Sequence, residues 1–333
     1  MHPVGAVTVG QKGQRLAEIG AMADSWAQVR MFSDDGRCVH NPVLMRRALE
    51  YVKAFDGVIA QHAQEPLLTD GAQMNEGAVS AELGLAGWPA VAEESIIARD
   101  VLLAQHVGSR VHICHLSTKG SVEIVRWAKQ RGIAVTAEAT PHHLLLTEEL
   151  VRSYDPVFKV NPPLRRESDV MALRAGLADG TIDTVGTDHA PHTAETKQCE
   201  WTVAAMGMTG LETALSVVQQ AMVDTGLMDW AGVARVMSTA PARIAGLTDQ
   251  GQADERGVPR VGAVANLVLV DPQARRTVDP EQHLTKSRNS PYRGMELPGA
   301  VRHTVYRGAR VVADGAPARP YRHPALTETG ERA

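Results

Sequence analysis

Short apolar runs alternate with longer segments of helical periodicity over the first two thirds of the chain. Six such runs have the length of a buried strand, at 4–8, 31–35, 58–62, 111–115, 134–139 and 181–185. The segments between them mostly repeat apolar residues every three or four positions. This alternation is typical of parallel βα units, in which helices cover a parallel sheet.

The helices that this pattern predicts are well delimited. They span 15–26, 42–55, 93–106, 121–131, 211–225 and 230–244. Asn41 and Pro42 are typical of a helix start, and one apolar face of that helix comprises Leu44, Ala48, Tyr51, Val52 and Phe55. Segment 67–91 is rich in glycine and polar residues, which favours a loop over an active-site face.

The pattern changes after Gly246. Segments 262–271 and 301–308 resemble strands with no long helix between them, which predicts a second, β-rich unit. We therefore expect a barrel-like domain at 1–245 and a partial β-sandwich unit at 246–333, with a mobile polar tail after Pro324. Six strands are too few for an eight-stranded barrel.

Composition narrows the class of protein. The chain has 333 residues, is 44% hydrophobic and 22% charged, and carries a net charge of −4 without a basic block, which argues against a nucleic-acid groove. No apolar stretch reaches the roughly 18 residues of a membrane span. Three cysteines without a Cys-x-x-Cys pair favour a reducing cytoplasm.

Four of the apolar runs end in side chains that can bind metals. These are Asp35, His62, His115 and Asp188. Taken singly, each is more often a hydrogen-bonded polar residue, and Asp188 in Thr187-Asp188-His189 is also compatible with a helix cap. Four of them at the carboxyl ends of four strands are hard to reconcile with that interpretation, because barrel enzymes place their chemistry there.

The sequence blocks around these residues resemble a known family. The blocks lie at 33–36, 61–64, 115–119, 140–144, 161–165 and 187–192. In this order they resemble the class I bacterial dihydroorotases of the amidohydrolase superfamily, up to about Gly315. The resemblance implies a (β/α)8 metallo-hydrolase barrel, incomplete here at about strands 3–8, with a small residual β-rich C-terminal unit.

The resemblance also implies a dinuclear zinc site. Asp35 would bridge the metals, His62 and His115 would complete one site, and Asp188 would be both a ligand and the general acid/base. No lysine occurs between Lys12 and Lys53, whereas hydantoinases and allantoinases use a carboxylated lysine as the bridge. This absence favours an Asp-bridged dihydroorotase.

Family members carry a His-x-His pair at the end of the first barrel strand, and none of the 13 histidines here forms one. We therefore expect the sequence to begin inside its own barrel, at the third strand, with an upstream start codon or missing sequence as the preferred explanation. We expect this form to hold at most one zinc ion tightly and to turn over poorly.

Further positions are assigned to substrate by the same resemblance. Asn161 and His192 would bind the substrate carboxylate, and backbone N–H groups at Met206 and Gly207 would contact the pyrimidine ring. A glycine-rich turn before a helix explains the segment around Gly207 equally well. His142 and His143 either orient the site or cap a loop.

Three functions remain open. The first is a dihydroorotase, interconverting dihydroorotate and N-carbamoyl-L-aspartate in pyrimidine biosynthesis. The second is another cyclic-amide hydrolase of the hydantoinase or allantoinase type, and the third is a non-catalytic scaffold for aspartate transcarbamoylase. Expected partners are a small-molecule substrate, a second copy of the chain and aspartate transcarbamoylase, with no nucleic acid and no membrane.

Overall fold

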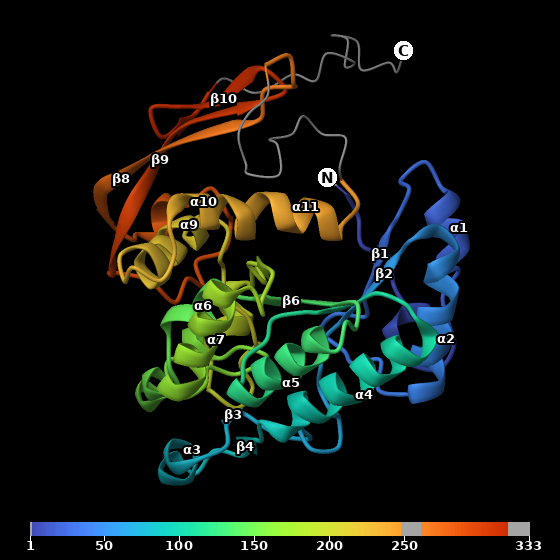
Figure 1. Ribbon diagram of the computed structural model, residues 1–333. Helices are drawn as coiled ribbons and strands as arrows, with labels where there is room; N and C mark the ends of the chain where they lie inside the picture. Colours follow the sequence, from blue (N-terminus) through green and yellow to red (C-terminus); the bar gives the residue numbers. More distant parts are fainter. Residues whose placement is uncertain (1, 248–260, 319–333) are drawn as a thin grey trace.

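A parallel sheet covered by helices forms the larger part of the computed structural model, which describes residues 2–247 and 261–318 (Figure 1). Its strand order is β1-β2-β5-β6-β7, and every pairing is parallel. The strands are β1 Met31–Phe32, β2 Val58–Gln61, β5 Val111–Ile113, β6 Val135–Ala139 and β7 Thr184–Val185. The predicted parallel α/β arrangement is confirmed.

Helices follow most of these strands. They are α1 Ile19–Asp24, α2 Pro42–Val52, α3 Ala78–Leu83, α4 Val91–Val107, α5 Lys119–Gln130, α6 Pro141–Leu145, α7 Glu167–Asp179, α8 Ala194–Lys197, α9 Ala214–Val218, α10 Trp230–Ala234 and α11 Ala240–Ile244. Short 3-10 helices are η1 Val9–Gln11, η2 Lys53–Phe55, η3 Glu148–Ser153, η4 Pro156–Phe158 and η7 Pro280–Gln282, and π-helical turns are η5 Gln219–Val223 and η6 Arg235–Thr239. Helices α2, α4, α5 and α7 pack one against the next along the sheet (Figure 1).

The main hydrophobic core lies between the sheet and this row of helices. Ile59 and Ile113 come from the strands and are fully buried. Leu49, Ile97 and Val125 come from α2, α4 and α5 and belong to the same cluster. Burying a side chain of this size contributes about 1.5–3 kcal/mol, so the core fixes the strands and with them the residues at their ends.

The first predicted strand is largely absent. Gly5 forms one parallel bridge with Phe32, but the next N–H groups, at Val7 and Thr8, donate to the Asp34 carboxylate at 2.9 and 3.0 Å instead of to a strand. Thr8 then pairs with Leu16, which holds the start of the predicted helix 15–26 in extended backbone. That helix is therefore shortened to α1.

Two further expectations about local structure were wrong. Segment 67–91 contains ordered elements, namely β3 Met74–Asn75, α3 and β4 Gly87–Trp88. Met74 and Val79 of this segment pack against Val151 and Trp201 in a small core. Tyr51 was expected on the buried face of α2 but is 45% exposed. The predicted start of α2 is confirmed, since the Asn41 side chain accepts from Val43 and Leu44 N–H.

The C-terminal part is an antiparallel sheet in the order β11-β10-β9-β8, far from β3 and β4 in Figure 1. Its strands are β8 Leu267–Thr277, β9 Glu296–Tyr306, β10 Ala309–Ala313 and β11 Ala316–Pro317. Both predicted strands occur with shifted bounds. The expected mobile tail after Pro324 lies outside the described residues, and the domain boundary at 245/246 stays a prediction.

Candidate metal centre and active site

Three of the four predicted metal ligands meet at the carboxyl ends of adjacent strands. Asp35, His62 and His115 follow β1, β2 and β5, which are neighbours in the sheet. His62 Nδ1 lies 3.0 Å from His115 Nε2. Asp35 Oδ1 lies 3.1 Å from His115 Nε2 and 3.2 Å from His62 Nδ1. Three ligand atoms thus converge on one point, where a cation would bind.

The two adjacent aspartates have different roles. Asp34 is 2% exposed, and its carboxylate accepts from Val7 N, Thr8 N and Thr8 Oγ1. These bonds tie the chain start to β1 and use up the Asp34 oxygens. The Asp35 side chain is 50% exposed and faces the two histidines, so Asp35 is the one available to a ligand.

Pairing dominates the electrostatics of this group. Burial disfavours charge on Asp35, but the hydrogen bond with His115 and the close contact with His62 outweigh it and hold the pKa of Asp35 well below its ordinary value. Burial likewise opposes charge on His115, yet the hydrogen bond to Asp35 raises the pKa of His115 to about 9. A strongly perturbed cluster of this kind is typical of functional sites.

Asp188 lies near this group without belonging to it. It follows β7, and its negative charge contributes to the raised pKa of His115. Its oxygens nevertheless lie outside the tight three-atom cluster. Burial raises the pKa of Asp188 against the opposing charge of His115. Asp188 and His115 both have positive φ, 45° and 33°, a strained backbone found most often where function requires it.

The four predicted substrate contacts lie on three segments of the chain, which hydrogen bonds connect to one another. Asn161 Nδ2 donates to Gln64 Oε1 at 3.1 Å. His192 Nε2 contacts Met206 O at 2.9 Å. The Gly207 N–H donates to Lys159 O at 2.9 Å and is therefore occupied. A Cβ on Gly207 would lie 2.7 Å from His192 Nε2, so only glycine permits this close approach.

The residues His142 and His143 are buried beside the Asn161 segment. His143 Nδ1 contacts Thr140 Oγ1 at 2.7 Å, and its Nε2 contacts Pro162 O and Pro163 O at 3.1 and 3.2 Å. Thr140 in turn caps α6. His143 thus joins the helix cap to the backbone that follows Asn161, which fits the capping role. A role in orienting the site stays a prediction.

Sequence reasoning missed a polar layer behind the ligands. Glu138 Oε2 lies 3.3 Å from His112 Nε2, and a Cβ on Gly186 would lie 2.5 Å from the Glu138 carboxylate. The side chains of His112, Cys114 and Glu138 form a second group of atoms that could bind a metal. Along β6, Thr136 and Glu138 alternate with buried apolar residues. This alternation was the signal in the sequence that could have indicated the polar layer.

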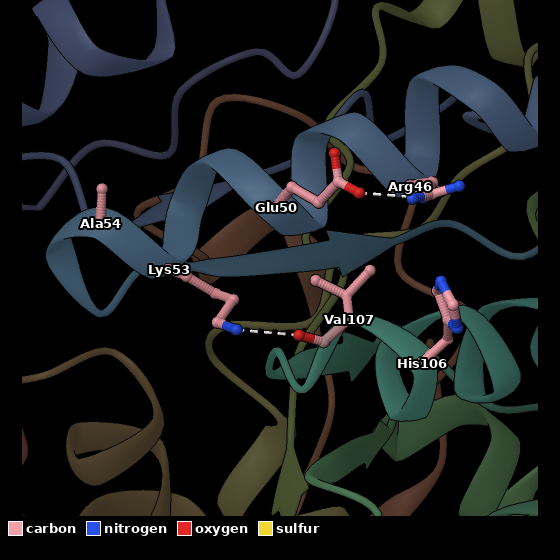
Figure 2. Close-up of a pocket in the computed structure, with 6 residues that line it drawn as sticks. All are labelled: Arg46, Glu50, Lys53, Ala54, His106 and Val107. Carbon is pink, nitrogen blue, oxygen red and sulfur yellow. Dashed lines mark hydrogen bonds and ion pairs between the residues drawn. The ribbon is translucent and has the colours of Figure 1, made fainter.

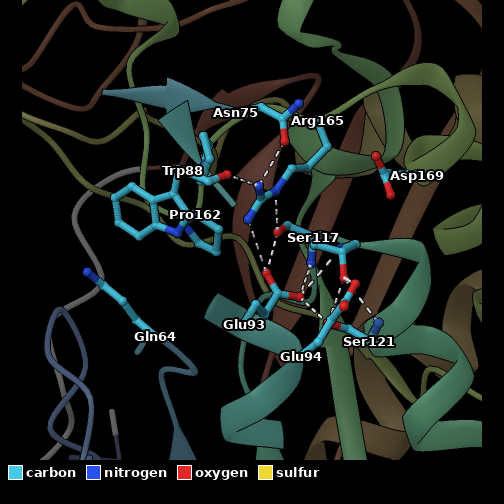
Figure 3. A network of polar contacts seen from close by, with 12 residues as sticks. Gln64, Asn75, Trp88, Glu93, Glu94, Ser117, Ser121, Pro162, Arg165 and Asp169 are labelled. Atoms are coloured by element: carbon cyan, nitrogen blue, oxygen red, sulfur yellow. Dashed lines mark hydrogen bonds and ion pairs between the residues drawn. The ribbon is translucent and has the colours of Figure 1, made fainter. Parts of the chain in front are cut away.

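A buried cation network was also missed (Figure 3). Arg165 is 1% exposed. Its guanidinium donates to Ser117 Oγ at 3.0 Å and to both Asn75 Oδ1 and Trp88 O at 2.8 Å. Glu93 receives Ser117 N–H at 2.9 Å. The network thereby links the loop after His115 to the segment that begins at Asn161.

The hollow of Figure 2 is not part of this site. It is lined by Arg46, Glu50, Lys53, Ala54, His106 and Val107. Lys53 donates to Val107 O there at 2.8 Å. These residues lie on α2 and η2, which lead into β2, and at the end of α4, which leads into β5, so the hollow is at the opposite end of the strands from His62 and His115.

Comparison with known proteins assigns this chain to a family. A family model described as dihydro-orotase-like matches residues 1–121. The dihydroorotase of Streptomyces coelicolor is 70% identical over 315 residues, covering 95% of this chain and 72% of that protein. The chain belongs to the dihydroorotase family. The dihydroorotase of Mycobacterium tuberculosis is 56% identical with the same coverage.

Solved structures similar to this dihydroorotase-family chain are cyclic-amide hydrolases. Dihydropyrimidinase from Brevibacillus agri has a TM-score of 0.78 at 22% identity, over 90% of this chain and 67% of that one. L-hydantoinase from Arthrobacter aurescens has a TM-score of 0.75 at 28% identity, over 84% and 62%. The chain thus shares the α/β fold of these structures. Within residues 2–247 and 261–318, no helix is long and apolar enough to span a bilayer.

Proposed function

We propose that this chain is a dihydroorotase, a cyclic-amide hydrolase that interconverts dihydroorotate and N-carbamoyl-L-aspartate in pyrimidine biosynthesis. One observation carries the proposal: a chain 70% identical to a dihydroorotase gathers Asp35, His62 and His115 at adjacent strand ends. The parallel sheet is then part of an eight-stranded barrel, and the antiparallel sheet is part of a β-sandwich unit.

The metal of this site is zinc in our proposal. Two imidazole nitrogens and a carboxylate oxygen are a common ligand set for catalytic zinc, which keeps a fourth position open. Zinc, when bound, would polarise the scissile carbonyl and lower the pKa of water. His62 Nδ1, His115 Nε2 and Asp35 Oδ1 would hold it, and this chain would bind one such ion tightly.

Asp188 is the general acid/base of the proposed reaction. One of its carboxylate oxygens takes a proton from the attacking water and returns it to the leaving amide nitrogen, so that the ring opens. The raised pKa of Asp188 suits this task, since it brings the carboxylate closer to the operating pH. Asn161, His192 and Met206 stay our candidates for binding the substrate. The Gly207 N–H already donates to Lys159 O, so Gly207 would serve only to permit the close approach of His192.

A substrate panel tests this function. Zinc-loaded protein is assayed with dihydroorotate, hydantoin and allantoin, with Streptomyces coelicolor dihydroorotase as the positive control. We expect slow but measurable hydrolysis of dihydroorotate and none of the other two. Faster hydrolysis of hydantoin would assign the chain to the other class of cyclic-amide hydrolases, and inactivity on all three would favour a non-catalytic scaffold.

The expected partners and compartment are also proposals. Cys38, Cys114 and Cys199 are free thiols, which supports a cytoplasmic protein. Leu267 and Leu269 lie two positions apart on β8, hence on one face of the sheet, and are 40% and 50% exposed, an apolar pair that supports a homodimer. Light scattering of the chain, alone and with aspartate transcarbamoylase, measures both associations.

A further inference from the structure

The side-chain amide of Asn161 is hydrogen-bonded through its nitrogen but not through its oxygen. Its Oδ1 is buried and has no hydrogen-bond partner among the described residues. Its Nδ2 donates to Gln64 Oε1 at 3.1 Å. Leaving a buried acceptor unpaired is unfavourable, so a group that donates to this oxygen is expected when the site is in use.

Gln64 is held in one orientation by Thr69. The Thr69 hydroxyl donates its single hydrogen to a backbone carbonyl, that of Glu65 at 3.0 Å or of Pro66 at 3.4 Å. Toward Gln64 the same oxygen is therefore an acceptor, and it receives Gln64 Nε2 at 2.8 Å. The amide oxygen of Gln64 must then point the other way.

That oxygen determines the state of His62. Gln64 Oε1 lies 2.7 Å from His62 Nε2, and because it is an acceptor, His62 carries its proton on Nε2. The lone pair is left on Nδ1, which faces Asp35 and His115. A hydrogen bond to the ring nitrogen that does not face the metal fixes the tautomer and the ring orientation of a metal-binding histidine.

We propose that Gln64, oriented by Thr69, is a positioning residue that couples the metal ligand His62 to the substrate contact Asn161. Its one oxygen receives both His62 Nε2–H and Asn161 Nδ2–H. The first bond presents His62 Nδ1 to the metal. The second leaves Asn161 Oδ1 as an acceptor, which fits an amide N–H of the substrate and not its carboxylate.

Three variants test the coupling. Gln64→Leu removes the shared acceptor, Thr69→Val lets the Gln64 amide turn, and Thr69→Ser keeps the hydroxyl. Gln105→Leu, on the exposed surface of α4, is the matched control. Zinc affinity is measured by competition with a chromophoric chelator, and dihydroorotate binding by calorimetry on the zinc-loaded protein.

We expect Gln64→Leu and Thr69→Val to weaken zinc binding about 10- to 100-fold and to weaken dihydroorotate binding as well. Thr69→Ser should keep the zinc and dihydroorotate affinities of the parent, because it retains the hydroxyl. Gln105→Leu should change neither affinity. Asn161→Ala should weaken dihydroorotate binding alone, with zinc affinity intact. The coupling would be overturned if Gln64→Leu left either the zinc affinity or the dihydroorotate affinity unchanged.

The substrate half of this inference rests on the proposed function, and the zinc half does not. If the parent protein binds zinc but no dihydroorotate, the proposed function fails. The zinc affinities of the variants still decide whether Gln64 positions His62. Histidine ¹⁵N NMR of the metal-free protein adds a direct readout, since we expect the Nε2–H tautomer of His62 in the parent and its loss in Gln64→Leu.

Discussion

Single residues at the ends of the parallel strands carry the chemistry of this molecule. Asp35, His62 and His115 follow directly from strand ends in a parallel sheet, because neighbouring strands bring their carboxyl ends together. Gln64 and Arg165 could not be found in this way. Their partners are distant in sequence, such as Asn161 for Gln64, and no periodic pattern specifies such a pairing.

Asp188→Asn tests the division of roles at the site. Because Asp188 lies outside the three-atom cluster, we expect zinc affinity to change little. Dihydroorotate turnover should fall by about 10²- to 10⁴-fold, the usual contribution of a general acid/base. Asp70→Asn, at an exposed position, is the control for charge alone. Loss of zinc binding in Asp188→Asn would instead make Asp188 a principal ligand.

Lys197 makes stability depend on pH. It is 4% exposed, and its Nζ donates to Lys159 O and Ala205 O. Burial, with a smaller effect of the Lys159 charge, lowers the pKa of Lys197 to about 7, whereas an unfolded lysine titrates near 10.4. Between these values the unfolded state binds more protons, so this residue makes stability rise with pH from about 7 to 10.

We therefore expect Lys197→Met to reduce that rise. Urea unfolding at pH 7 and pH 9 gives the free energy of unfolding of parent and variant, and their difference should be larger at pH 9. Lys119→Met, at a side chain that is 62% exposed, should leave the pH dependence as it is. Equal differences at both pH values would contradict a depressed lysine pKa.

At the scale of elements, the type of structure was predicted well and the ends of elements less well. β6 and α4 lie close to their predicted bounds, since apolar periodicity records which face is buried. The first strand and helix 15–26 were overestimated because the Asp34 carboxylate takes the N–H groups of Val7 and Thr8. A side chain that competes with backbone pairing from 26 or more positions away leaves no local signal.

Arg165 links several elements, and its removal should be costly. Arg165→Met leaves Asn75 Oδ1 and Trp88 O without their donor, and the neighbouring Glu93 loses the only nearby cation in the described network. We expect a loss of about 3–5 kcal/mol, typical of breaking a buried ionic cluster. Urea unfolding measures it.

The adjacent Arg166 is the matched control. Its side chain is 57% exposed and lies 3.8 Å from Glu148, so Arg166→Met should cost less than about 1 kcal/mol. Similar losses in the two variants would show that the buried network adds nothing beyond an ordinary surface contact.

At the scale of the whole molecule, two sheets of different kinds were foreseen from the change in pattern near Gly246. The barrel itself was not derivable from strand counting, because six expected strands and five observed ones both fall short of eight. The closed barrel stays a proposal, and similarity to solved dihydropyrimidinase and hydantoinase structures supports the α/β fold. The metal centre depends on it, since adjacent parallel strands bring Asp35, His62 and His115 together.

Zinc-edge anomalous diffraction from zinc-loaded crystals tests this account most directly. We predict a peak about 2.0–2.2 Å from His62 Nδ1, His115 Nε2 and Asp35 Oδ1. A peak at His112, Cys114 and Glu138 instead, or no peak near the strand ends, would contradict the assigned metal centre.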